Sequence, residues 1–144
     1  MKKELISSVV GIALVCSVVF LAGCGANRVD LIDSGSLNLE KKASGKVYVA
    51  WSDVYEDEKG FVVTGVLRRR DRVGLPIKTE VCVTLLSPDG TVLDEAHSSE
   101  VYVPRRIIGK FRGFKRFRVR FENMPPEGSL VRIAACSKLQ DDES

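Results

Sequence analysis

Short runs of alternating apolar residues dominate the chain from Lys46 onward. In the runs 47–51 and 77–85 every second residue is apolar or β-branched, which places these side chains on one face of an extended strand. No window after residue 45 keeps apolar residues at i, i+3 and i+4 over three helical turns. Similar runs follow at 61–67, 91–93, 101–103, 117–121 and 131–135. This spacing predicts an all-β fold, an antiparallel β-sandwich of six or seven strands.

Turn-forming residues separate the runs, at 56–60, 87–90 and 124–128. Trp51 and Phe61 are interpreted as core packing, the alternative being a ligand platform. The predicted core is made of the inward side chains of these strands: Val47, Val49, Phe61, Val63, Val81, Val83, Phe117, Val119, Val131 and Ile133.

The composition fits one folded domain. The chain has 144 residues, of which 44% are hydrophobic and 28% charged, and this balance excludes a disordered chain and a multi-pass membrane protein. A large share of the apolar residues lies within the first 24, so this segment needs its own interpretation.

The N-terminus has the pattern of an export signal. Met1-Lys2-Lys3 is basic, and the apolar run 9–22 has the length of a secretory core and is short for a spanning helix. The run ends in Leu21-Ala22-Gly23-Cys24, which resembles the lipobox of bacterial lipoproteins. The resemblance implies cleavage after Gly23 and a diacylglyceryl thioether on Cys24. An uncleaved signal anchor and an ordinary signal peptide are the alternatives.

Four segments follow from this interpretation. We expect a lipoprotein signal peptide at 1–23, a lipidated N-terminus and flexible tether at 24–45, a β-sandwich domain at 46–138 and a disordered acidic tail at 139–144. Gly25 stands where enterobacterial sorting would read Asp as a retention signal. By that analogy the protein is anchored to the outer membrane, facing the periplasm.

Two stretches resemble known sandwich domains. Gly65-Val66-Leu67, a polar gap and the strand that ends at Asp89-Gly90 resemble immunoglobulin-like domains of bacterial lipoproteins, those named for a Phe-x-Leu-Tyr-Asp motif. Leu85-Leu86-Ser87 stands where that motif has Leu-Tyr-Asp. Residues 117–133 resemble the E-to-F corner of a fibronectin type III domain. The resemblance implies an immunoglobulin-like sandwich with a binding or structural role and no enzymatic activity.

Two cysteines remain after the signal is removed and Cys24 is lipidated, namely Cys82 and Cys136. In a fibronectin-like strand order their strands are neighbours. A disulfide then requires a register that brings the two Cα atoms within roughly 7 Å. The sequence does not fix the register, so a disulfide and a pair of free thiols both stay open.

The richest chemical feature is basic. Residues 105–120 hold eight Lys or Arg and no acid, and a strand at 116–120 aligns three guanidinium groups on one face. Such a row suits phosphates or carboxylates; the alternative is a solvated face paired with acids of neighbouring strands. The run 68–72 is expected to be a solvated loop, with Arg69 facing away from Arg68 and Arg70. The candidate anion-binding residues are Arg105, Arg106, Arg116, Arg118 and Arg120.

Nothing in the chain indicates catalysis. His97 is the only histidine, and no nucleophile motif, zinc motif or phosphate loop occurs. We therefore expect no enzyme, no cofactor, no metal and, because of export, no nucleic-acid partner. The leading hypothesis is a lipid-anchored interaction or structural module of the cell envelope, which contacts an envelope protein or an anionic lipid or polymer. The alternatives are an accessory subunit of a membrane-associated enzyme or assembly, and a periplasmic carrier of apolar ligands.

Overall fold

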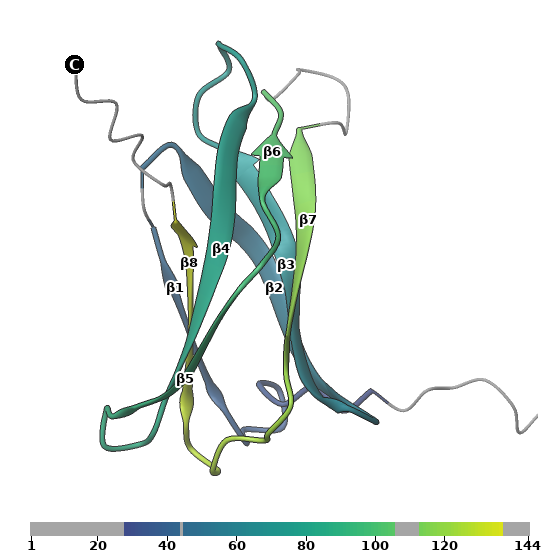
Figure 1. Cartoon of the computed structure of the whole chain (residues 1–144), viewed down its shortest axis with the longest axis vertical. Helices are drawn as coiled ribbons and strands as arrows, with labels where there is room; N and C mark the ends of the chain where they lie inside the picture. Colours follow the sequence, from purple (N-terminus) through teal and green to yellow (C-terminus); the bar gives the residue numbers. More distant parts are fainter. Residues whose placement is uncertain (1–27, 44, 106–112, 137–144) are drawn as a thin grey trace, which may run out of the picture.

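The computed structural model describes residues 28–43, 45–105 and 113–136, and these residues form strands and turns with no helix. Two sheets face each other (Figure 1). The buried side chains of both sheets form one cluster. The predicted all-β fold is thereby confirmed. No helix in the described ranges is long and apolar enough to cross a membrane.

The first sheet has three antiparallel strands in the order β2-β3-β7. These strands are β2 (Val47–Asp57), β3 (Gly60–Arg69) and β7 (Phe114–Phe121). Glycine at position 60 suits the tight β2–β3 hairpin, because its φ of 127° lies in a region that L side chains rarely adopt.

The second sheet has the order β1-β8-β4-β5, and a short strand, β6, also pairs with β4. Its strands are β1 (Asn38–Lys42), β4 (Ile77–Leu86), β5 (Val92–His97), β6 (Val101–Val103) and β8 (Leu130–Cys136). The pairing of β1 with β8 is parallel, and the others are antiparallel. The described residues therefore hold eight strands, where the sequence predicted six or seven, and the sandwich is not wholly antiparallel.

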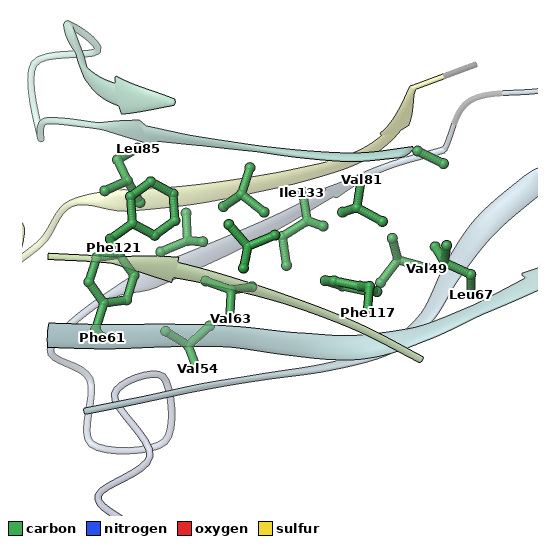
Figure 2. Packing of buried hydrophobic residues seen from close by; sticks show 14 of the residues in the cluster. Val49, Val54, Phe61, Val63, Leu67, Val81, Leu85, Phe117, Phe121 and Ile133 are labelled. Carbon is green, nitrogen blue, oxygen red and sulfur yellow. The ribbon is translucent and has the colours of Figure 1, made fainter. Parts of the chain in front are cut away.

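The core lies between the sheets, and all ten predicted core residues are buried. Figure 2 shows side chains of this core meeting from both sheets, among them Phe61, Phe117 and Ile133. The rings of Phe61 and Phe121 stack with centroids 4.8 Å apart. The strand alternation thus gave the correct buried face for β3, β4, β7 and β8, and for β2 as far as Val49.

The expected tether at 24–45 is wrong from residue 30 onward. The backbone N–H of Leu31 donates to the carbonyl of Val54 at 2.9 Å, and β1 pairs with β8 along its whole length. Leu31 and Leu37 are buried in the core, and removing these apolar side chains from water favours docking of the segment over a free chain. The sandwich therefore begins near Asp30 rather than at residue 46. The expected signal peptide, Cys24 and the acidic tail 139–144 lie outside the described residues.

The interpretation of Trp51 as a core residue is also wrong. The register of β2 against β3 shifts between Val49 and Trp51, which marks a β-bulge. One extra residue in a strand moves the following side chains to the opposite face. Trp51 is therefore 54% exposed, on the outer surface of the first sheet.

Candidate functional site

The outer surface of the β2-β3-β7 sheet brings together three of the predicted arginines. On β7 the side chains of Phe117, Val119 and Phe121 are buried, so those that alternate with them point to solvent. The strand register places Arg116, Arg118 and Arg120 in three successive cross-strand rows with residues of β3 and β2. We call this surface the arginine–tryptophan face; its rows are Trp51–Val66–Arg116, Asp53–Thr64–Arg118 and Tyr55–Val62–Arg120.

One carboxylate partly neutralises the three arginines. Asp57 Oδ2 lies 2.6 Å from Arg120 Nη2 and 3.6 Å from Arg118 Nη2. Within the described residues Arg116 forms no ion pair. The solvated-face alternative therefore holds in part, since an acid of the same sheet pairs with two of the arginines, although it lies at the end of β2, two strands from β7. Because the three arginines of β7 have only this one acid among the described residues as an ion-pair partner, they keep a net positive charge, and the Arg118 side chain remains 54% exposed.

A fourth arginine reaches this face from the N-terminal segment. The guanidinium carbon of Arg28 lies 4.8 Å from the centroid of the Tyr55 ring, a cation–π contact. Asp30 forms a β-bridge with Tyr55, which fixes the segment along the edge of β2. Sequence reasoning missed Arg28 because residue 28 fell inside the expected tether.

Two acids lie close together beside this segment. Desolvation by burial, a hydrogen bond with Asp30 and the charge of Asp30 raise the pKa of Asp53. For Asp30, burial acts upward, but hydrogen bonds from the backbone N–H groups of Asp33 and Ile32 outweigh it and lower the pKa. Asp30 therefore ionises before Asp53, and the protonated Asp53 carboxyl donates the hydrogen bond that joins the two side chains.

The arginine–tryptophan face is hollowed into a groove. One hollow of about 620 Å³ is lined by residues that include Trp51, Thr64 and Arg116. A second, of about 830 Å³, extends past Lys59 and Arg120. Arg28, Tyr55 and Arg118 line both hollows, so the two adjoin in the middle of the face. We call the combined depression the groove.

Of the other two predicted arginines, only Arg105 belongs to the described residues. Arg105 is exposed beyond the end of β6 and does not line either hollow. Arg106 lies outside the described residues, as does Cys24. Within the described residues, three of the four candidate arginines of this run therefore line the groove.

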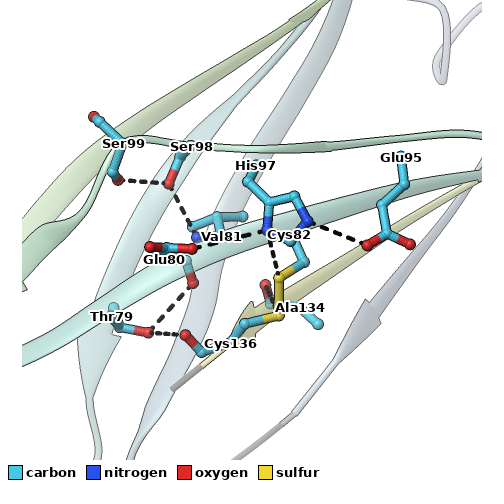
Figure 3. The surroundings of a disulfide bond; sticks show 10 residues. All are labelled: Thr79, Glu80, Val81, Cys82, Glu95, His97, Ser98, Ser99, Ala134 and Cys136. Atoms are coloured by element: carbon cyan, nitrogen blue, oxygen red, sulfur yellow. Dashed lines mark hydrogen bonds and ion pairs between the residues drawn. A yellow bond between two sulfur atoms is a disulfide. The ribbon is translucent and has the colours of Figure 1, made fainter. Parts of the chain in front are cut away.

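The two cysteines left open by the sequence form a disulfide in the structure. Cys82 on β4 and Cys136 on β8 are bonded with an S–S distance of 2.02 Å and a Cα–Cα distance of 6.0 Å. The register pairs Cys82 with Ala134, so the bridge runs diagonally across two antiparallel strands. His97 Nδ1 lies 3.3 Å from Cys82 Sγ, and its Nε2 lies 3.2 Å from a carboxylate oxygen of Glu95 (Figure 3). This cluster belongs to the second sheet, apart from the groove.

Arg69 has a role that sequence reasoning missed. Its side chain is only 3% exposed, where a solvated loop was expected. Its Nε donates to Asp71 at 2.6 Å, and its two terminal nitrogens donate to the carbonyls of Val73 and Leu75. The alternation that set Arg69 opposite to Arg68 and Arg70 already pointed it inward, and this was the available signal.

The shape of the β3–β4 loop follows from these bonds. Arg69 ties together the backbone of residues 71–75, and Asp71 also lies 4.0 Å from Lys46 Nζ. The side chains of Val73 and Leu75 remain 78% and 85% exposed.

Among the described residues, no group of three or more His, Cys, Asp or Glu side chains is arranged to hold a metal ion. Comparison of the chain with protein-family models, curated proteins and solved structures finds no match.

Proposed function

We propose that the protein is a lipid-anchored, non-enzymatic module of the bacterial cell envelope that binds an anionic envelope component in the groove. The observation that carries this proposal is the row of three arginines in register on β7, with one carboxylate shared between two of them. The immunoglobulin-like resemblance of the chain is consistent with a binding role but does not by itself identify a ligand.

The chemistry of the row favours anions with several oxygens. A guanidinium group offers parallel N–H donors that match the spacing of phosphate and carboxylate oxygens. An incoming anion has Arg116 and the exposed edge of Arg118 available, while Arg120 remains engaged with Asp57. Because these side chains are largely exposed, we expect binding to weaken with added salt, over a screening length of about 8–10 Å.

The proposed anchor lies close to the groove. Cys24, in the stretch that resembles a lipobox, precedes Arg28 by four residues. Four residues reach at most about 14 Å when fully extended. Arg28 lines both hollows of the groove. With Cys24 acylated, the groove therefore lies near the head-group region of the membrane that holds the protein, which by the Gly25 analogy is the outer membrane.

Binding is tested with the chain 25–144, which retains every described residue and lacks the lipid. Sedimentation with vesicles containing phosphatidylglycerol, and with an anionic polymer, is compared between the wild type and the triple variant R116Q/R118Q/R120Q. The matched control K41Q/K42Q/R72Q removes the same charge from exposed side chains outside the groove. We expect only the first variant to lose binding. If both variants lose binding equally, binding depends on the net charge of the protein and not on the groove, which contradicts the proposal. If the wild type does not bind at low salt, the proposal is wrong.

A further inference from the structure

The groove contains one feature that anion binding alone does not explain. Trp51 is the only tryptophan of the chain, and it stands 54% exposed at one end of the groove. Large aromatic side chains usually gain most by burial, and tryptophan is highly buried on average. The β-bulge in β2 turns this residue outward, into the row that contains Arg116. An exposed indole in a cationic row points to a ligand with an apolar face as well as a charge.

We infer that the ligand is an anionic saccharide, with a sugar ring packed on Trp51 and its phosphate or carboxylate group held by Arg116 and Arg118. This inference rests on the proposed function and specifies its ligand class. A pyranose ring presents C–H groups on one face and hydroxyl groups around its rim. The C–H face packs on the electron-rich face of an aromatic ring, and the hydroxyl groups need polar partners.

The rows of the arginine–tryptophan face supply both kinds of partner at suitable spacing. Trp51 and Arg116 stand at opposite ends of one row, two strand spacings or about 10 Å apart. The next row, about 7 Å along the strands, adds Asp53, Thr64 and Arg118. Thr64 and Asp53 both line the groove and offer hydrogen-bonding oxygens to sugar hydroxyl groups.

The composition of the groove favours a saccharide over an acyl chain. Its far end is lined by Glu56, Asp57, Glu58, Lys59 and Arg120, a polar set in which acids outnumber bases, so this end suits sugar hydroxyl groups and the anionic group belongs at the Arg116 end. An acyl chain would require an enclosed apolar channel, whereas a short sugar chain can lie along an open, polar groove with one ring on Trp51.

The test uses the fluorescence of Trp51, since the single tryptophan reports contact at this site alone. Three probes of equal length separate the contributions: oligogalacturonate carries sugar rings and charge, its methyl ester carries rings without charge, and polyphosphate carries charge without rings. Each is titrated into the chain 25–144 at low salt. We expect oligogalacturonate to shift the emission of Trp51 and to bind at least about tenfold more tightly than its ester.

The variants are W51A, W51F and R118Q, with binding measured by calorimetry where the tryptophan is absent. We expect W51A to weaken oligogalacturonate binding about tenfold and polyphosphate binding less than about twofold, W51F to retain most of the affinity, and R118Q to weaken both probes. If W51A affects the two polyanions equally, or neither, the saccharide inference fails while the proposed function stands. If the ester binds as tightly as the acid, the arginines do not select the ligand and the inference fails. If neither polyanion binds the wild type, the proposed function fails.

Discussion

The ring of Phe117 on β7 packs directly over Gly65 on β3. The two residues are opposite each other in the strand register, and a Cβ added at position 65 would lie 2.7 Å from the Phe117 ring and still closer to the backbone oxygen of Trp51. Glycine is required here by close approach, because any side chain would occupy space that the phenylalanine ring and the β2 backbone already fill.

Gly65→Ala should therefore destabilise the protein, by about 1–3 kcal/mol, since overpacking a filled core forces neighbouring groups to shift. The midpoint of urea unfolding, followed by circular dichroism, measures the change. Phe117→Leu in the same chain should relieve part of the clash, so the double variant should lose less than the sum of the two single variants. Strict additivity would show that Phe117 does not press on position 65.

Phe117→Ala empties a buried site and should lower the free energy of unfolding by about 3–5 kcal/mol.

Removing the disulfide should lower stability without changing the fold. The bond between Cys82 and Cys136 closes a loop of 54 residues, and the loss of chain entropy in the unfolded state contributes about 2–4 kcal/mol. The double variant C82A/C136A tests this by its unfolding midpoint. Mass spectrometry of the exported wild type under non-reducing conditions should show no alkylatable thiol at either position. Two free thiols in folded protein would contradict the bridge.

Arg69→Met should loosen the β3–β4 loop. The substitution keeps an apolar stem but leaves Asp71 and the carbonyls of Val73 and Leu75 without their donor. Losing these hydrogen bonds should cost about 1–3 kcal/mol and speed amide exchange in residues 71–75. Arg68→Met is the matched control, because Arg68 is exposed in the preceding position. Equal effects of the two variants would mean that the loop does not depend on Arg69.

Asp53→Asn should stabilise the protein near neutral pH. Burial first, and then Asp30, raise the pKa of Asp53 above its ordinary 3.8. The folded state therefore binds a proton more tightly than the unfolded state, and the stability from this group is present at low pH and lost as the pH rises through the folded pKa. Asparagine keeps the hydrogen-bond donor toward Asp30 without ionising. Unfolding midpoints from pH 3 to pH 8 should show the variant gaining on the wild type as pH rises. A difference between the two proteins that stays constant over this range would contradict the raised pKa of Asp53.

Cys24→Ser should abolish lipidation. The motivation is the stretch Leu21-Ala22-Gly23-Cys24, which resembles a lipobox. Metabolic labelling with a fatty-acid analogue should mark the wild type and the control variant Cys16→Ser, and should leave Cys24→Ser unlabelled and uncleaved. If Cys24→Ser carries as much label as the wild type, Cys24 is not the lipidated residue and this prediction is wrong.

Local patterns were enough to predict the buried face of most strands, because side-chain alternation is a property of each strand alone. Where a strand is irregular, the same reasoning fails: the bulge after Val49 reversed the facing of Trp51, and no residue type in β2 marks it. Contacts between residues far apart in the sequence could not be predicted either. Asp57 and Arg120 are 63 residues apart, and Glu40 meets Arg132 across 92, so neither the neutralising acid nor the docking of β1 follows from nearby residues.

The last strand of the described residues, β8, lies in the interior of its sheet. β8 is hydrogen-bonded to β1 on one side and to β4 on the other, with Asn38 paired to Leu130. Until residues 130–136 have been made, the strand that lies between β1 and β4 is missing, and the second sheet cannot close over the core. Such non-local pairing is slow to form, and a chain synthesised from its N-terminus stays open until its final strand arrives. Under the export proposed above, this delay would keep the chain unfolded during its passage through a narrow translocation channel, which premature folding would block.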